Sequence, residues 1–334
     1  MAQALRGVGA EVALITAPEL VPSLSEGIWP LRAPQATLVL DPLAAAASEL
    51  LGQVDAAGVF LASPRLQPFL HSQRQAARLR RHRSTPLFTG PLLPMTGDAL
   101  SADLLPRLGY DLLCLPGDAQ VEELSWLIRG TAHERQAHEA IGLWSLPTRP
   151  IGHGEVREPL LVVLEQERIP ASARDTALLY SRLRSLALAS PSWQVRLQPD
   201  HPLPADPREW SEISLAWHHQ QDDRPPQNLQ LGQLADLPFC LMQASACLGI
   251  SSPWLLSAMV WGKPTVVLGE YGIRTEFNSP LFFASGVMRR LADCQPLEEL
   301  LQAPAPNAHW LEGLGWGIAD GPQRLLRRLQ ELAR

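Results

Sequence analysis

The sequence predicts an α/β fold in which two Rossmann-like domains face each other across a cleft. At 334 residues the chain is too long for one core and suits two domains. Strand-length apolar runs alternate with longer amphipathic stretches, which is typical of βα units around a parallel sheet. The stretch LPTRPIGHGEVREP at 146–159 has many prolines and glycines and no periodicity. We therefore predict a domain over 1–147, a linker over 148–158, a domain over 159–303 and a helical tail over 304–334.

The first half opens on a helix-like stretch, AQALRGVG, which Gly7 and Gly9 would end. The strands predicted after it are 12–16, 36–41, 58–62, 86–90 and 111–116. Helices are predicted over 43–52, 66–82, 98–108 and 118–143. Because a doubly wound domain usually opens on a strand, we expect its first βα element to be shortened or to lie upstream of this start.

The second half repeats the alternation. Its predicted strands are 160–166, 193–199, 212–218, 239–244 and 264–270, and its predicted helices are 172–188, 229–236 and 252–261. A terminal helix over 322–334 carries an apolar face through Leu325, Leu326, Leu329 and Leu332. We expect this helix to cross back toward the first domain and to brace the hinge.

Composition excludes several classes of protein. Apolar residues make up 46% and charged residues 19%, which indicates a well-buried globular chain. The net charge of −6 argues against a nucleic-acid-binding protein. The arginine patch RQAARLRRHR at 74–83 is either a solvated helix end or a surface for anions or for peripheral membrane contact.

The cysteines and the amino terminus indicate a cytoplasmic protein. The four cysteines show no Cys-x-x-Cys spacing and lie in or beside apolar runs, which favours buried free thiols. No uninterrupted apolar run reaches the roughly 18 residues of a membrane span. Arg6 and Glu11 interrupt the apolar content that a signal peptide would need.

The stretch LGISSPWLLSAMVWGKPTVVLG at 248–269 predicts an anion-binding helix start. Ser252 is a good N-cap, and Pro253 suits the first helical position, where its missing N–H has no intrahelical partner to lose. Helix amino termini concentrate unpaired N–H groups and partial positive charge, so two serines there can cradle a phosphate. Capping alone explains Ser252 but not Ser251. Lys263, the only lysine, lies just past this helix and suits its dipole.

A second motif, VRLQPDHPLPADP at 195–207, places His201 at the carboxyl end of a strand. Pro199 and Pro202 fix the chain direction around it, and strand ends of α/β domains point into the ligand crevice. A histidine there can donate to a phosphate oxygen or protonate a leaving group. The alternative is a histidine in an ordinary proline-rich turn.

Together the two motifs resemble the carboxyl-terminal domain of bacterial glycosyltransferases of the GT-B fold. The pattern is similar to that of sialyltransferases, polysialyltransferases and capsule enzymes that use CMP-activated sugars. The first half also resembles a poorly characterised family of bacterial glycosyltransferases, through TPLFTGPLLPMTGDAL…RLGYDLLCLPGDAQVEEL (85–124) and AIGLWSLP (140–147). The resemblance implies that His201, Ser251 and Ser252 hold the phosphate of the leaving nucleotide.

The resemblance also implies roles for other residues. Glu270 and Tyr271 lie where a ribose or base would bind, although they can equally form a surface loop. The related enzymes carry an acidic pair followed by glycine as general base, whereas this chain has Thr96-Gly97-Asp98. Asp98 is the best-placed base in the first half, with a simple N-cap as its alternative, and Asp118 has the same ambiguity. A glutamate that GT-B enzymes often carry within the serine helix is missing here.

We therefore expect a glycosyltransferase of cell-surface polysaccharide synthesis that moves a sugar from a nucleotide-activated donor, such as a CMP-sugar, to a glycan or other hydroxyl acceptor. No metal or cofactor is expected, because helix N–H groups and His201 can meet the phosphate charge, and no zinc or P-loop motif appears. Two alternatives stay open. One is a non-catalytic sugar-nucleotide-binding or scaffold protein, and the other is a sugar-nucleotide epimerase or hydrolase.

Overall fold

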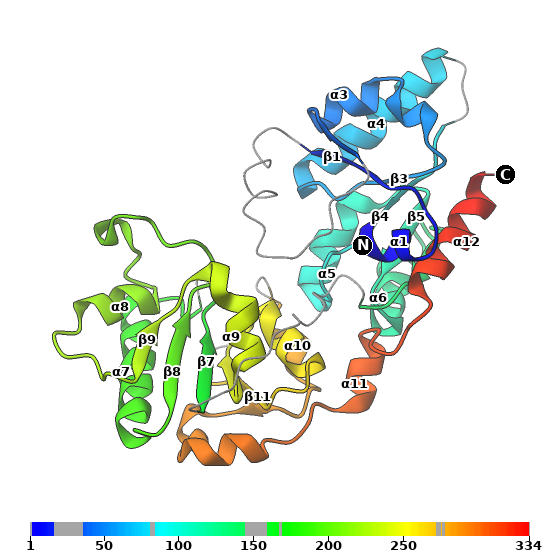
Figure 1. Ribbon diagram of the computed structural model, residues 1–334. Coiled ribbons are helices and arrows are strands. Elements are labelled where there is room, and N and C mark those ends of the chain that lie inside the picture. Colours follow the sequence, from blue (N-terminus) through cyan, green and yellow to red (C-terminus); the bar gives the residue numbers. More distant parts are fainter. Residues whose placement is uncertain are drawn as a thin grey trace. The chain divides into compact units, whose positions relative to one another are not determined.

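The protein is described by a computed structural model that covers residues 2–16, 36–80, 84–143, 159–166, 169–271, 275 and 278–333. The chain divides into two compact units (Figure 1). Unit 1 comprises Met1–Leu146 and Ala308–Arg334, and unit 2 comprises Pro147–Asn307. The stretch predicted as the linker, 148–158, lies outside the described residues.

Unit 1 contains a parallel sheet in the order β3-β4-β5-β6 and a separate parallel pair, β1-β2. The strands are β1 (Ala13–Thr16), β2 (Ala36–Val39), β3 (Ala57–Gly58), β4 (Leu87–Thr89), β5 (Leu112–Leu115) and β6 (His138–Ala140). The α-helices are α1 (Ala2–Gly7), α3 (Pro42–Ala47), α4 (Ser63–Arg80), α5 (Gly97–Leu104), α6 (Asp118–Ile128), α11 (Ala308–Gly313) and α12 (Gly321–Ala333), and the short 3₁₀ turns are η2 (Leu50–Gln53) and η3 (Leu105–Arg107).

The terminal helix α12 packs against unit 1. Leu325 and Leu329 of its apolar face are buried with Leu5, Phe88 and Leu112 in one core cluster. The helix expected to return to the first domain is therefore part of it, and it begins and ends within a residue of the predicted bounds.

Glycines let the returning chain approach the carboxyl ends of β5 and β6 closely. A side chain on Gly117 would lie 2.3 Å from the backbone N of Gly315, and one on Gly321 would lie 1.7 Å from the carbonyl oxygen of Ile141. Backbone therefore packs directly on backbone here, which only glycine permits. The segment before α12 covers this part of the sheet edge.

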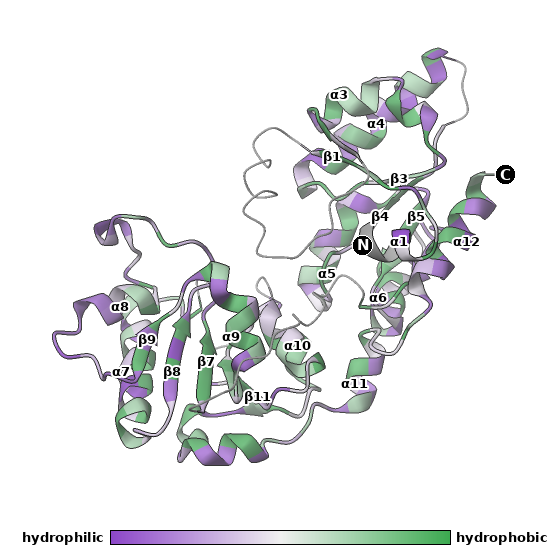
Figure 2. Ribbon diagram, in the orientation of Figure 1, coloured by the Kyte–Doolittle hydropathy of each residue, from purple (hydrophilic) through white to green (hydrophobic). Residues whose placement is uncertain are grey.

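Unit 2 is a six-stranded parallel sheet in the order β12-β11-β10-β7-β8-β9 (Figure 1). The strands are β7 (Leu160–Leu164), β8 (Gln194–Gln198), β9 (Leu229–Leu231), β10 (Ala246–Gly249), β11 (Thr265–Leu268) and β12 (Met288–Arg289). Numbered from β7 this order is 3-2-1-4-5-6, the Rossmann order, so the predicted α/β fold class is confirmed. Figure 2 shows β7 coloured as apolar along its length, as expected for a strand covered on both faces.

Helices of unit 2 connect these strands. They are α7 (Ala173–Ala189), α8 (Leu215–Gln221), α9 (Leu237–Gln243) and α10 (Pro253–Val260), with 3₁₀ turns η4 (Pro207–Glu209), η5 (Leu234–Asp236), η7 (Ser279–Phe282), η8 (Leu291–Cys294) and η9 (Leu297–Gln302). The core on the α7 face combines Leu179 and Leu183 of the helix with Leu161, Val195 and Leu248 of the strands.

Several predicted elements of unit 2 are wrong. The strand predicted over 212–218 is not formed, because Ser214 accepts a hydrogen bond from the Trp217 N–H and caps helix α8, which begins at Leu215. Residues 229–236 begin with strand β9, and 239–243 of the strand predicted over 239–244 belong to helix α9, which has Pro238 in its first turn. The strand before the serine helix is β10, at 246–249. Short apolar runs fit a strand and a buried helix turn equally well. This ambiguity explains why α8 and α9 were predicted as strands and β9 as part of a helix.

In unit 1 the helix predicted over 118–143 ends at Ile128, and strand β6 follows it. The helix predicted over 43–52 divides into α3 and η2, and the strand predicted over 58–62 is formed only as β3, Ala57–Gly58. The helices predicted over 66–82, 98–108, 172–188 and 252–261 agree with α4, α5, α7 and α10 within a few residues. Cys114, Cys240, Cys247 and Cys294 are buried free thiols, as predicted. No helix among the described residues is long and apolar enough to cross a membrane.

Candidate functional site

The carboxyl edge of the unit 2 sheet gathers most of the predicted site residues. His201 follows β8, Ser251 and Ser252 follow β10, and Glu270 and Tyr271 follow β11. Since all these strands are parallel, their carboxyl ends lie at one edge. The strand order reverses between β7 and β10, and this switch point is where doubly wound sheets bind ligands.

Ser251 and Ser252 begin helix α10 at the switch point. The Ser252 hydroxyl accepts a hydrogen bond from the Trp254 N–H at 3.4 Å, and Pro253 occupies the first turn, so the predicted cap is confirmed. Ser251 is only 6% exposed, and among the described residues its hydroxyl has no hydrogen-bond partner. A buried polar group without a partner costs about 1–3 kcal/mol. An anion at this helix start would provide the missing partner.

Gly249 brings β10 close to β7 just before this turn. It pairs with Leu164, and a side chain at Gly249 would lie 2.9 Å from the Leu164 carbonyl oxygen. The turn that carries Ser251 therefore starts directly beside the end of β7.

His201 is paired with its neighbour Asp200. The imidazole Nδ1 lies 2.6 Å from Oδ1 of Asp200, and the histidine side chain is 48% exposed. A neutral imidazole that donates its Nδ1 proton to this carboxylate keeps Nε2 as a proton acceptor, and the charged form can donate from it. β8 and β10 both pair with β7, so the strand ends before His201 and Ser251 are two strand spacings apart, about 10 Å.

Glu165 directly follows β7 between these two strand ends. It is 8% exposed, and its Oε1 accepts a hydrogen bond from the Leu215 N–H at 2.6 Å. Burial raises the pKa of Glu165 to about 7; the Leu215 N–H opposes this shift, the charge of Asp200 adds to it and His201 opposes it. The carboxyl therefore titrates near neutral pH.

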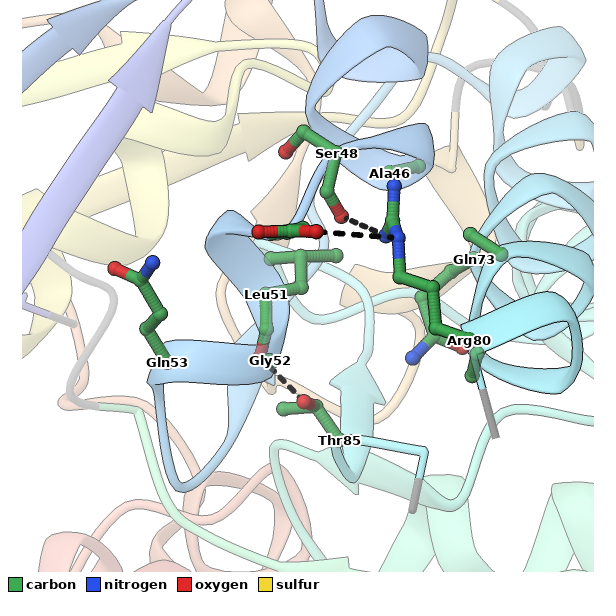
Figure 3. A pocket seen from close by; sticks show the side chains of 11 residues that line it. Ala46, Ser48, Leu51, Gly52, Gln53, Gln73, Arg80 and Thr85 are labelled. Carbon is green, nitrogen blue, oxygen red and sulfur yellow. Dashed lines mark hydrogen bonds and ion pairs between the residues drawn. The ribbon is translucent and has the colours of Figure 1, made fainter. Parts of the chain in front are cut away.

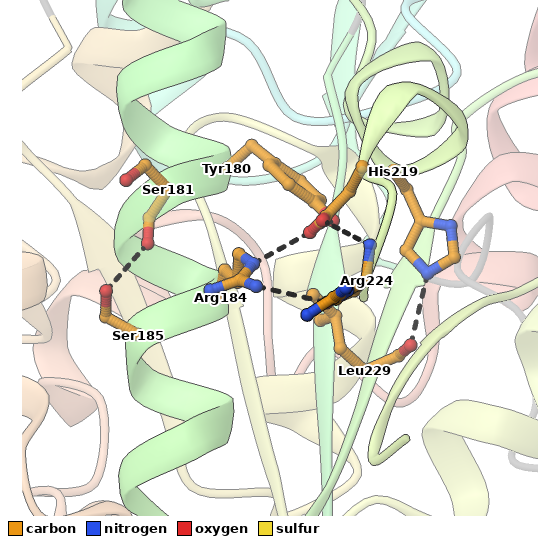
Figure 4. Close-up of polar contacts among 8 residues, drawn as sticks. Tyr180, Ser181, Arg184, Ser185, His219, Arg224 and Leu229 are labelled. Atoms are coloured by element: carbon orange, nitrogen blue, oxygen red, sulfur yellow. Dashed lines mark hydrogen bonds and ion pairs between the residues drawn. The ribbon is translucent and has the colours of Figure 1, made fainter. Parts of the chain in front are cut away.

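A polar network holds the helix that supplies this N–H. Arg184 Nε of α7 donates to Oδ2 of Asp222 at 2.8 Å, and the Tyr180 hydroxyl donates to the same oxygen at 2.9 Å (Figure 4). His219 of α8 contacts the carbonyl of Leu229 in β9 at 3.1 Å. The network ties the carboxyl end of α8 to α7 and β9, so the Leu215 end stays beside β7.

Glu270 and Tyr271 contact helix α7. Arg182 Nη1 lies 3.2 Å from Oε1 of Glu270, which also accepts a hydrogen bond from the Leu291 N–H at 3.0 Å. The same guanidinium donates to the Tyr271 hydroxyl at 3.5 Å. Lys263 donates to the carbonyls of Met242 and Ala244, at 2.6 Å and 2.8 Å, and so holds the end of α9.

Asp98 belongs to unit 1, whereas the other predicted site residues belong to unit 2. It is exposed in the first turn of α5, whose N-cap is Thr96, so the N-cap interpretation of Asp98 is wrong. Asp118 likewise lies inside the first turn of α6, after Gly117 as N-cap. Both carboxylates suit the positive end of a helix dipole.

The sequence interpretation missed Asp200 and Glu165. The signal for Asp200 was its place before the histidine in PDHP, and that for Glu165 was a carboxylate that ends the apolar run LLVVL. Among the described residues, no group of three or more His, Cys, Asp or Glu could hold a metal ion.

The arginine patch serves unit 1 in part. Arg80 donates to the carbonyls of Ser48 and Ala47, both at 2.6 Å, at the end of α3, and Arg74 donates to the Gly109 carbonyl at 2.5 Å. Arg80 also lines a cavity of about 400 Å³ with Gln73 and Thr85 (Figure 3). Residues 81–83 of the patch lie outside the described residues.

Comparison with known proteins gives a family and a fold. A family model described as "Putative glycosyltransferase (DUF6716)" matches residues 43–332. No curated protein sequence matches the chain.

Three solved structures illustrate the likeness in fold. A UDP-GlcNAc 2-epimerase from Methanocaldococcus jannaschii is 13% identical, with a TM-score of 0.63 over 99% of this chain and 94% of that one. MnaA of S. aureus, in a co-structure with UDP, is 12% identical, with a TM-score of 0.53 over 90% and 83% of the two chains. An α,α-trehalose-phosphate synthase (UDP-forming) from Burkholderia vietnamiensis is 14% identical, with a TM-score of 0.50 over 87% and 75%.

Proposed function

The chain belongs to this glycosyltransferase family, and we propose that unit 2 binds a nucleotide-activated sugar through the carboxyl edge of its sheet and that the protein transfers the sugar to a hydroxyl acceptor. The observation that carries the proposal is the buried Ser251 hydroxyl, which lacks a partner among the described residues at the start of α10. An unsatisfied hydroxyl beside helix N–H groups suits a phosphate oxygen.

In this proposal the donor phosphate is held between Ser251 and His201. Ser252 contributes through the cap that keeps the first turn of α10 open to the anion. The Asp200 carboxylate orients the His201 imidazole, which then donates to a phosphate oxygen as the sugar–phosphate bond breaks. The strand ends are about 10 Å apart, a gap that side chains and a phosphate group can fill together.

The nucleotide and the acceptor are finer points of the proposal. CMP is suggested by the motif resemblance, and UDP by two solved structures of the same fold, MnaA with UDP and the UDP-forming trehalose-phosphate synthase. Glu270 and Tyr271 stay candidates for nucleotide binding. In this proposal the nucleotide replaces the contacts that both residues make with Arg182. A glycan of the cell surface remains the proposed acceptor, with Asp98 as the base that deprotonates its hydroxyl.

The proposed reaction needs no metal, since helix N–H groups and His201 balance the phosphate charge. We further propose a cytoplasmic enzyme whose arginine patch, 74–83, touches a membrane surface that carries the acceptor. Arg78 is exposed there, whereas Arg80 is engaged with α3.

A sugar-nucleotide epimerase is the second candidate, because the UDP-GlcNAc 2-epimerase shares the fold over 99% of this chain. An epimerase returns an intact sugar nucleotide, whereas a transferase releases free nucleotide. The test is to incubate the protein with CMP-, UDP- and GDP-sugars and to follow thermal stabilisation together with nucleotide release, in wild type and in His201→Ala.

Nucleotide release that needs an added hydroxyl acceptor and that His201→Ala abolishes supports the transferase. Release without an acceptor indicates a hydrolase, and a new isomer of the sugar nucleotide supports the epimerase. Stabilisation without either product indicates a binding or scaffold protein. If no nucleotide sugar stabilises the protein, the proposed donor site is wrong.

A further inference from the structure

Glu165 lies between the residues proposed to hold the donor phosphate. Its backbone N–H donates to the Gln198 carbonyl at 2.9 Å, which fixes it beside the end of β8. The preceding residue, Leu164, pairs with Gly249 at the end of β10. Glu165 therefore adjoins both the turn that carries His201 and the turn that carries Ser251.

Glu165 lines a small, mainly apolar pocket at this edge. Gly249 and Ile250 of the β10 turn line the same pocket, so Glu165 and the start of the serine turn share one space. The Leu215 N–H is bound to Oε1 at 2.6 Å. A carboxylate in such surroundings has few water molecules to stabilise its charge.

The charged groups that face Glu165 come from one segment. Among the described residues these are Asp200 and His201, which oppose each other in their effect on the carboxyl. The elements packed around it otherwise contribute groups that do not ionise near neutral pH: Thr176 and Leu179 from α7, Leu215 from α8, Gly249 and Ile250 from β10, and Leu268 from β11.

A bound phosphate would change this balance. Its negative charge next to the buried carboxyl disfavours the ionised form, since like charges raise the pKa of a carboxylate. Burial already holds the pKa of Glu165 at about 7. Little further shift is needed for the acid form to dominate at neutral pH.

We propose that Glu165 takes up one proton from solvent when a nucleotide phosphate binds at the Ser251 turn, and that it stands in the complex as a neutral carboxylic acid. The inference rests on the proposed function, because it needs the nucleotide to bind at this edge. Glu165 acts in it as a positioning residue: it keeps the Leu215 contact and removes a negative charge from the phosphate site. Donor affinity is then linked to pH through a side chain outside the two motifs.

The test is calorimetric titration of the full chain with CMP and with UDP between pH 7.5 and pH 8.5. In this range the nucleotide phosphate, with a second pKa of about 6, is already ionised. The affinity of the wild type should fall several-fold, toward the limit of about tenfold per pH unit for one linked proton. Titrations in two buffers of different ionisation enthalpy should give uptake of close to one proton.

Glu165→Gln is the decisive variant, since its amide oxygen can still accept from Leu215 while the group no longer titrates. It should bind the nucleotide with nearly constant affinity over this range and take up almost no proton. His201→Asn is the matched control, because the imidazole is the other group beside the site that can gain a proton. Infrared difference spectra on nucleotide addition should show a protonated-carboxyl band in wild type that Glu165→Gln lacks.

The outcomes separate the two proposals. Binding of CMP or UDP without pH dependence, or uptake that survives in Glu165→Gln and disappears in His201→Asn, overturns the role of Glu165 alone. No binding of either nucleotide at any pH overturns the proposed donor site, and this inference with it.

Discussion

Ser251 and Ser252 should respond in opposite ways to removal of their hydroxyls. The Ser252 hydroxyl accepts from the Trp254 N–H and caps α10, so Ser252→Ala should lower the free energy of unfolding by about 0.5–2 kcal/mol. The Ser251 hydroxyl is buried without a partner among the described residues. Ser251→Ala removes that desolvation cost of about 1–3 kcal/mol and loses only the packing contacts of one oxygen atom. Its free energy of unfolding should therefore be unchanged or higher.

Nucleotide affinity, unlike stability, should depend on the Ser251 hydroxyl. A hydrogen bond to a charged group contributes about 1.5–3 kcal/mol, which corresponds to a factor of about 10 to 150 in Kd. Ser251→Ala should therefore weaken CMP or UDP by that factor while the free protein keeps its stability. A variant that binds the nucleotide more weakly but unfolds at the same urea concentration identifies a residue that serves ligand binding and not stability.

Ser279 provides a matched control. It is also 6% exposed, and its hydroxyl also lacks a partner among the described residues, but it is the first residue of η7, after β11, and is not part of the β10 turn. Ser279→Ala should match Ser251→Ala in urea unfolding and leave nucleotide affinity at the wild-type value. If Ser251→Ala destabilises the free protein as much as Ser252→Ala, or binds the nucleotide as wild type does, Ser251 is not a phosphate ligand.

Three further predictions follow from the geometry. Asp200→Asn should lower kcat about 10–100-fold with a smaller effect on donor affinity, since the carboxylate contacts Nδ1 of His201 and orients the imidazole. The pKa of Glu165 is raised from 4.5 to about 7 in the folded protein. The free energy of unfolding should therefore decrease by about 3 kcal/mol as pH rises from about 4.5 to about 7. Urea titrations of the wild type should show this decrease, and those of Glu165→Gln should not. Gly321→Ala places a side chain 1.7 Å from a backbone oxygen and should lower the free energy of unfolding by about 1–3 kcal/mol or more. Gly52→Ala is the control: the space around Gly52 is open, so its thermal stability should change little.

The sequence predicted the fold class and the serine helix because both depend on local signals. Ser252 and Pro253 mark a helix start wherever they occur, and alternating βα elements imply a parallel sheet. The phosphate cradle is such a local structure, so its residues could be named in advance. Strand β10 was missed, although it carries that cradle, because ACLG is less apolar than the neighbouring run FCLM, which lies in α9.

Asp200 and Glu165 could not be recognised for a different reason. The contact between His201 and Asp200 depends on how the turn folds after β8, which the two flanking prolines constrain without specifying. Glu165 reads as an ordinary polar residue at a strand end until α8 is placed, and residues 212–218 were predicted as a strand. A helix there is what brings the Leu215 N–H to the carboxyl.

The carboxylates at the unit 2 edge explain why one of them should be protonated in a complex with an anion. Glu270 is balanced by Arg182 and by the Leu291 N–H, and Asp200 is balanced by His201 when the imidazole is charged. Among the residues that the structure describes, Glu165 has one neutral donor at hydrogen-bond distance, the Leu215 N–H. The charge of His201 can compensate only one negative charge of the bound phosphate. The repulsion between the rest of the phosphate charge and an ionised Glu165 is then uncompensated. A proton on that carboxyl removes the repulsion without moving any backbone, which is the least costly adjustment that this edge offers.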